Sequence, residues 1–95
     1  MSDVFHAMSS PVRRKILSML KSRDMTAGEI AECLDVGKST LSGHFNVLKA
    51  ADLVSTSRSA TTITYSLNVS VAEELIAMVA TILSISKEEE DQSHD

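Results

Sequence analysis

The sequence has little cysteine, proline, glycine or tryptophan, and these shortages exclude whole classes of protein. It has 95 residues, with one cysteine, one proline, three glycines and no tryptophan. Because the lone Cys33 cannot form an internal disulfide, a disulfide-stapled secreted scaffold is excluded and a cytoplasmic chain is expected. The glycines form no phosphate-binding loop, and there is neither a nucleophile elbow nor a paired-carboxylate pattern. We therefore expect a protein that is not an enzyme.

Long hydrophobic runs are also absent. The most apolar stretch, residues 71–85, is too short and too polar to span a bilayer, so membrane insertion is not expected. The N-terminus lacks the basic and apolar regions of a signal peptide. We expect one small domain over residues 1–86 and an acidic, frayed tail at 87–95. A domain of this size buries little surface, so a partner subunit would stabilise it.

Charge is distributed unevenly along the chain. The formal net charge of −4 argues weakly against nucleic acid as a partner. Residues 1–69 carry eight Lys and Arg against six Asp and Glu, whereas residues 70–95 carry one Lys against seven acids. The acidic excess therefore belongs to the C-terminal segment. Because DNA binding depends on the charge of the presented face, DNA remains a candidate partner.

Capping signals and hydrophobic spacing predict three helices in the first third of the chain. A short helix is expected at residues 4–8. Ser10 and Pro11 have the residue types of an N-cap and a first helical position, and they open a second helix that ends at residues 21–23. Thr26 and Glu29 form a capping box, which opens a short third helix.

A fourth helix is expected from about Lys38, after a tight break at residues 35–37. Its apolar positions recur at helical spacing and predict a buried stripe. They are Leu41, Phe45 and Leu48. The opposite face is small and polar throughout, and it consists of Lys38, Ser39, Ser42, Gly43, Asn46 and Lys49.

A β-hairpin and a last helix complete the expected fold. Residues 53–56 and 62–67 have strand propensity, and the polar turn between them lacks the Gly or Asn that tight hairpins favour. Asn68 or Ser70 caps the last helix, and Ser70 with Glu73 would make a second capping box. The order α-α-α-α-β-β-α is mainly α with a small β-hairpin, an α+β arrangement typical of a winged helix-turn-helix.

Four segments, in order along the chain, carry a specific resemblance to one family. They read FHAMSSPVRRKIL at 5–17, MTAGEIA at 25–31, STLSGHFNVLKAADLV at 39–54 and YSL at 65–67. They resemble the ArsR/SmtB family of winged-helix transcriptional repressors, most of all its SdpR-type autorepressors, over residues 5–85. The resemblance implies a cytoplasmic homodimer that binds an inverted-repeat operator in double-stranded DNA. Its own promoter is one such operator, and an inducer of unknown identity often releases the repressor.

The resemblance places the fourth helix in the major groove of DNA, where short hydroxyl side chains allow close approach. A solvated polar face is the alternative. Gly43 either permits close approach or is a tolerated substitution, and His44 either contacts DNA or is tucked at the helix boundary. Arg58 is the only basic residue of the expected hairpin, which therefore offers few groups that could contact DNA. The expected DNA-contacting residues are Lys38, Ser39, Thr40, Ser42, Gly43, His44, Lys49 and Arg58.

The basic run of residues 13–15 has two interpretations. It is either a phosphate-binding patch or a solvated helix flank, and the flank is favoured.

The last helix carries an apolar stripe too wide for the core of so small a domain. Twofold pairing through this helix and the first helix would bury the stripe. It would also set two recognition helices about 34 Å apart, one DNA turn. The expected dimer interface is Val4, Phe5, Met8, Leu75, Met78, Val79, Ile82 and Leu83.

Metal sensing, known in this family, is not expected here, and no cofactor is expected. Thr26 and Gly28 stand where the family places a cysteine pair, and the last helix has no histidine ligands. Cys33 is expected to be half-buried and inert, since Glu32 and Asp35 disfavour a thiolate. Two other functions stay open: a winged-helix adaptor that binds protein and not DNA, and a redox repressor acting through Cys33.

Overall fold

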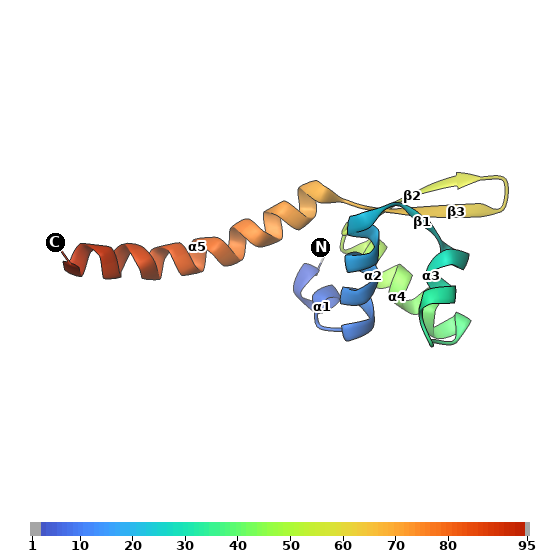
Figure 1. Ribbon diagram of the computed structural model, residues 1–95, viewed down its shortest axis with the longest axis horizontal. Helices are drawn as coiled ribbons and strands as arrows, with labels where there is room; N and C mark the ends of the chain where they lie inside the picture. The colour runs from blue at the N-terminus through green and yellow to red at the C-terminus, as the bar shows by residue number, and fades with distance from the viewer. Residues whose placement is uncertain (1–2, 95) are drawn as a thin grey trace.

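The structure is a computed structural model that describes the backbone of residues 3–94 and the side chains of residues 3–84. Helices α1–α4 and the sheet form a body, from which α5 projects on the side away from the tip of the β2–β3 hairpin (Figure 1). In the described residues, no helix is long and apolar enough to cross a membrane. The elements are α1 (Val4–Met8), α2 (Pro11–Ser22), β1 (Met25–Thr26), α3 (Ala27–Cys33), α4 (Lys38–Ala50), β2 (Val54–Ser59), β3 (Thr62–Leu67) and α5 (Val69–His94).

The sheet contains a strand that the sequence did not predict. β1 pairs antiparallel with β3, with Met25 opposite Tyr65 and Thr26 opposite Thr64, so the strand order is β1-β3-β2. A strand of two residues is too short to show an alternating pattern. It exists because β3 offers it a pairing edge. The short strand therefore ties the start of α3 to the hairpin.

The hairpin turn is tighter than expected. β2 continues to Ser59, so Arg58 lies within the strand, opposite Ile63, and only residues 60–61 connect the strands. Ala60 has φ of 55°, a left-handed conformation that glycine adopts without strain. The expectation of a longer polar turn at 57–61 was therefore wrong, because Ala60 takes the conformation usually left to glycine.

Two of the predicted helix caps are confirmed. The Ser10 hydroxyl accepts from the N–H of Arg13 at 3.2 Å and caps α2. At α3, the Glu29 N–H donates to the Thr26 hydroxyl at 3.1 Å, and the Thr26 N–H donates to the Glu29 carboxylate at 2.9 Å. This second bond holds the pKa of Glu29 below its usual value, and nearby Arg23 acts in the same direction. Both helices begin where local sequence signals place them.

The start of α5 differs from the sequence prediction. Asn68 is the residue before the helix, and its side chain accepts from the N–H of Val71 at 3.5 Å. Ser70 lies inside the helix, so the capping box predicted for Ser70 and Glu73 does not form. The backbone of α5 continues to His94, through the segment expected as a frayed tail. The division of the chain at residue 86 stays a prediction.

The core joins the helices to the sheet. Phe45 of α4 stacks on Tyr65 of β3, with ring centroids 4.3 Å apart and an interplanar angle of 21°. This contact fixes α4 against the base of the hairpin. The core residues are Ala7, Ile16, Leu17, Leu20, Met25, Ile30, Leu41, Phe45, Leu48, Ala51, Leu53, Val54 and Tyr65.

Candidate nucleic-acid interface

Helix α4 presents one polar face to solvent because the opposite face is anchored in the core. Leu41, Phe45 and Leu48 are 3%, 6% and 0% exposed, and they recur on one side of the helix. Side chains on the other side are short or flexible, so another surface can approach the helix closely. The exposed positions of α4 are Lys38, Ser39, Thr40, Ser42, Gly43, Asn46, Lys49 and Ala50.

The N-terminus of α4 is capped differently from those of α2 and α3. Its N-cap is Gly37, and no side chain accepts a hydrogen bond from its first turn. In α2 and α3, Ser10 and Thr26 supply that acceptor. The N–H groups at the start of α4 are thus available to an oxygen from outside the chain. An anion is favoured there by the helix dipole as well.

Acidic residues are nearly absent from the segment that contains α4 and the hairpin. Between residues 36 and 72, Asp52 is the only acid, whereas Lys38, Lys49 and Arg58 are exposed basic residues. The net charge of −4 therefore does not describe this surface. None of the chain's acids lies on α4 or on the two strands of the hairpin, so the polar face of α4 is compatible with a polyanion.

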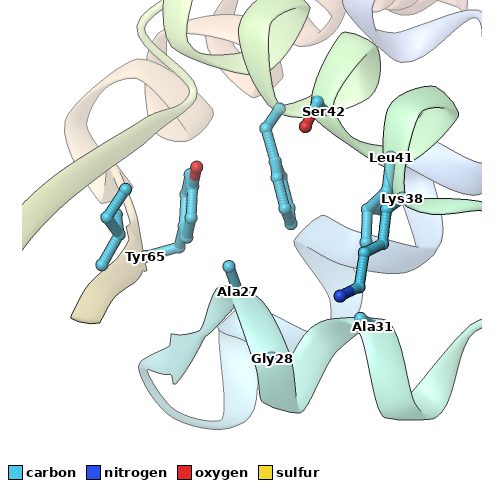
Figure 2. Close-up of a pocket in the computed structure, with 9 residues that line it drawn as sticks. Ala27, Gly28, Ala31, Lys38, Leu41, Ser42 and Tyr65 are labelled. Atoms are coloured by element: carbon cyan, nitrogen blue, oxygen red, sulfur yellow. The ribbon is translucent and has the colours of Figure 1, made fainter. Parts of the chain in front are cut away.

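A hollow of about 360 Å³ separates α3 from α4 and β3 (Figure 2). Small residues on α3 leave this space, and Lys38 reaches over it from α4. Burial raises the pKa of the Tyr65 phenol, which keeps that wall uncharged. The hollow gives the surface a concave shape beside the start of α4. Its lining is Ala27, Gly28, Ala31, Lys38, Leu41, Ser42, Phe45, Ile63 and Tyr65.

His44 differs from the other expected contact residues of α4 because it is half-buried. Its Nδ1 lies 3.0 Å from a terminal guanidinium nitrogen of Arg13 in α2. Of the two interpretations of His44, this contact favours the tucked side chain. A direct DNA contact through His44 stays a prediction.

The basic run at residues 13–15 is not the uniform surface feature that the sequence suggested. Arg13 is 7% exposed and its guanidinium donates to the carbonyls of Ala7 and His6 at 2.8 and 2.9 Å. Arg14 donates to the carbonyl of Met8 at 2.8 Å. Both arginines thus bind the C-terminal carbonyls of α1. For Arg13, the solvated flank and the phosphate patch are both wrong, because a buried guanidinium needs internal acceptors.

The apolar surface lies mainly on α5. Val79, Met78, Leu83 and Ile82 are 46%, 43%, 57% and 68% exposed, while Leu75 is half-buried. Among the residues whose side chains the structure describes, seven large hydrophobic side chains are exposed, which is unusual for so small a body.

α1 contributes less to this surface than expected. Phe5 is 60% exposed, whereas Val4 and Met8 pack against the chain's own core. Of the three interface residues expected in α1, only Phe5 therefore stands free for a partner.

Two exposed residues with a place on these surfaces were not among the expected site residues. Asn46 lies on the polar face of α4, one helical turn after Ser42 and two turns after Ser39. Ile76, 66% exposed, extends the apolar stripe of α5. Helical spacing alone is a sufficient signal for both, because each lies on the same side of its helix as residues that were expected.

Cys33 is exposed, so the expectation of a half-buried thiol was wrong. It is the last residue of α3, three positions after the core residue Ile30. In the part of the chain that the structure describes, no three His, Cys, Asp or Glu side chains lie close enough together to hold a metal ion.

Known proteins resemble this chain in sequence and in fold. A family profile described as a helix-turn-helix domain matches residues 8–57. The transcriptional repressor SdpR of Bacillus subtilis is 49% identical over 76 residues, covering 80% of this chain and 84% of the relative. The transcriptional activator HlyU of Vibrio cholerae is 32% identical, covering 77% of this chain and 68% of the relative. The solved structure of an ArsR-like transcriptional regulator from Rhodococcus has a TM-score of 0.78 at 26% identity, covering 90% and 81% of the two chains.

Proposed function

Since this chain belongs to the ArsR/SmtB family of winged helix-turn-helix transcriptional regulators, we propose that it represses transcription as a homodimer bound to an inverted-repeat operator. The observation that carries the proposal is the polar, acid-free face of α4, the second helix of the helix-turn-helix. Repression is favoured over activation because the relative named a repressor is 49% identical and the relative named an activator is 32% identical.

In this proposal α4 enters the major groove with its polar face toward the base edges. Ser39 and Ser42 offer short hydroxyls that can bond to either base type. Asn46 offers an amide that can bind adenine through two hydrogen bonds, so it is the most selective side chain on this face. Lys38, Lys49 and the open N-terminus of α4 neutralise phosphates and fix the register of the helix.

The dimer follows from the apolar surface of α5. Two copies that pair through α5 and Phe5 would bury side chains that one copy leaves in water. Twofold symmetry then presents two α4 helices to successive major grooves, which requires an operator of two inverted half-sites. A bound dimer would exclude RNA polymerase from an overlapping promoter. One such promoter is proposed to be that of the gene that encodes this chain. The proposed location is the cytoplasm, where the chain can reach chromosomal DNA.

Selection from random DNA duplexes tests the proposal without knowledge of the natural operator. The full chain should enrich a short inverted repeat. Asn46→Ala should relax the base preference at one base pair in each half-site. The discrimination against the wrong base at that pair should fall by about 1–3 kcal/mol. A winged-helix adaptor without DNA binding would enrich no sequence at all, and that outcome would overturn the proposal.

A matched pair of lysine variants tests the placement of the interface. Lys38→Ala should weaken binding to every sequence and reduce the salt slope by about 1. Lys21→Ala removes the same charge from the exposed end of α2 and should leave affinity nearly unchanged. Equal losses in the two variants would contradict the assignment of α4 as the reading helix. A promoter–reporter fusion, silenced rather than induced by the chain, would separate repression from activation.

A further inference from the structure

Arg13 is the most deeply buried charged residue in the part of the chain whose side chains are described, and it connects three helices. It belongs to α2, its partners Ala7 and His6 belong to α1, and its partner His44 belongs to α4. The three distances are 2.8, 2.9 and 3.0 Å, and each uses a different nitrogen of the guanidinium. All three sides of the planar group are therefore engaged.

The chemistry of the three partners defines the state of His44. Arginine has only donors, so a hydrogen bond across this contact requires the imidazole Nδ1 to accept, which the tautomer with its proton on Nε2 provides. The carbonyls of His6 and Ala7 belong to the last turn of α1. The His6 carbonyl also accepts from the N–H of Ser9 at 3.1 Å and from its hydroxyl at 2.6 Å, whereas for the Ala7 carbonyl the Arg13 guanidinium supplies a donor at 2.8 Å. The guanidinium of Arg13 thus binds C-terminal carbonyls of α1 and contacts His44 of α4 at the same time.

We propose that Arg13 is a positioning residue for DNA reading, which fixes the recognition helix α4 relative to α1. This inference rests on the proposed function. α1 carries Phe5, which is exposed and belongs to the proposed dimer surface, whereas α4 carries the reading face. The guanidinium bridges the two helices across the body. It therefore sets the angle and distance of each reading helix from the twofold axis, and with them the half-site spacing that the dimer accepts.

Arg13→Lys tests this bridge, with Arg14→Lys as its matched control. Lysine keeps the charge but cannot reach two carbonyls and an imidazole from one planar group. Arg14 is exposed and bonds only the Met8 carbonyl, so its replacement removes no link to α4. Each full-length variant is measured on the duplex selected by the unmodified chain, on the same half-sites moved one base pair apart or together, and on random duplex.

For Arg13→Lys we expect a folded dimer whose affinity for the selected duplex falls about tenfold or more. Affinity for random duplex and the salt slope should stay unchanged, because the phosphate contacts remain. Arg13→Lys should show a smaller preference for the original half-site spacing over the altered spacings, whereas Arg14→Lys should keep the full preference. A merely structural role would instead lower thermal stability and weaken binding to all duplexes alike, with the spacing preference retained, and that result would overturn the inference.

His44→Ala provides an independent variant, since it breaks the link to α4 and leaves Arg13 bound to α1. It should reproduce the loss of preference for the original half-site spacing. The double variant should be no worse than Arg13→Lys alone, because that variant already lacks the contact with His44. If Arg13→Lys does not fold, His44→Ala alone decides. A reduced salt slope in His44→Ala would identify a direct phosphate contact and contradict the positioning role. If the unmodified chain selects no sequence, the proposed function fails; if it does and spacing preference survives in both variants, only this inference fails.

Discussion

At the scale of single residues, Ala60 is the clearest point of strain. Of the described non-glycine residues, only Asp52 and Ala60 have positive φ, at 58° and 55°. The left-handed conformation costs a residue with a Cβ about 1–2 kcal/mol, while a glycine loses about 0.5–1 kcal/mol more conformational entropy on folding. Ala60 therefore occupies a position at which glycine is the better residue.

Ala60→Gly should raise the free energy of unfolding by about 0.5–1 kcal/mol and the melting temperature by a few degrees. The neighbouring Thr61→Gly serves as the control, because Thr61 does not have a positive φ and its replacement should be destabilising. Thermal unfolding followed by circular dichroism measures both. A loss of stability in Ala60→Gly would show that the turn does not have the described conformation.

Residue-scale contacts are also where sequence reasoning reached its limit. Arg13 lies at helical spacing from Ile16, Leu17 and Leu20, so the pattern places it on the buried face of α2, but its basic type favoured an exposed flank. Its burial depends on carbonyls of α1 and on His44, which lies 31 residues further along the chain. The exposure of Cys33 likewise depends on how α3 is oriented against the core. The groups that satisfy Arg13 and the exposure of Cys33 arise from tertiary packing, so the spacing of residue types does not reveal them.

At the scale of helices and strands, the sequence predicted most of the fold because the signals are local. The Ser10 cap with Pro11, and the reciprocal bonds of Thr26 and Glu29, mark two helix starts correctly. The apolar spacing correctly assigned the buried face of α4, and hence the polar face opposite. β1 was missed because two residues carry no period, and it forms only where β3 supplies a pairing edge.

Gly43 gives a test at the level of helix α4. A Cβ built at this position meets nothing within 4 Å, so the fold itself does not require glycine. Gly43→Ala should therefore stabilise the chain by about 1 kcal/mol through helix propensity alone.

The affinity of the same variant for the selected duplex decides between the two interpretations of Gly43. A fall in affinity despite the higher stability would show that DNA approaches the helix closely at Gly43. Unchanged affinity would show a tolerated substitution. A loss of stability in Gly43→Ala would contradict the open space that the structure shows beside the helix.

At the scale of the whole molecule, the two surfaces lie in different parts of the fold. α5 projects from the body on the side away from the hairpin tip (Figure 1). The backbone of α5, along which most acids of the C-terminal segment are attached, thus extends away from the hairpin, and this distance lowers their repulsion of a polyanion there. Because the acidic helix and the polar face of α4 are separated, DNA binding by α4 is compatible with the chain's net charge of −4.

Val79→Asp tests the proposed dimer surface. Val79 is 46% exposed in the single chain, so the variant should fold with nearly unchanged helical content. In a dimer the carboxylate would be buried without a partner, which should shift sedimentation to the monomer. With one half-site lost, a nanomolar affinity should become micromolar or weaker.

Ala77→Asp is the control for Val79→Asp, because Ala77 is exposed on the side of α5 away from the apolar stripe. It should remain a dimer and bind normally. If Val79→Asp sediments as a dimer with normal affinity, α5 is not the interface. If Val79→Asp unfolds, its side chain belongs to the core of the single chain.

The salt dependence of binding to the selected duplex tests the central claim most directly, that the acid-free surface of α4 and the hairpin binds DNA. If each protomer neutralises about three to five phosphates, the logarithm of the dimer's association constant should fall with the logarithm of salt concentration at a slope of about −5 to −9. Fluorescence anisotropy over a series of salt concentrations measures this slope. A slope near zero would mean that the surface does not contact phosphates, and it would contradict the account.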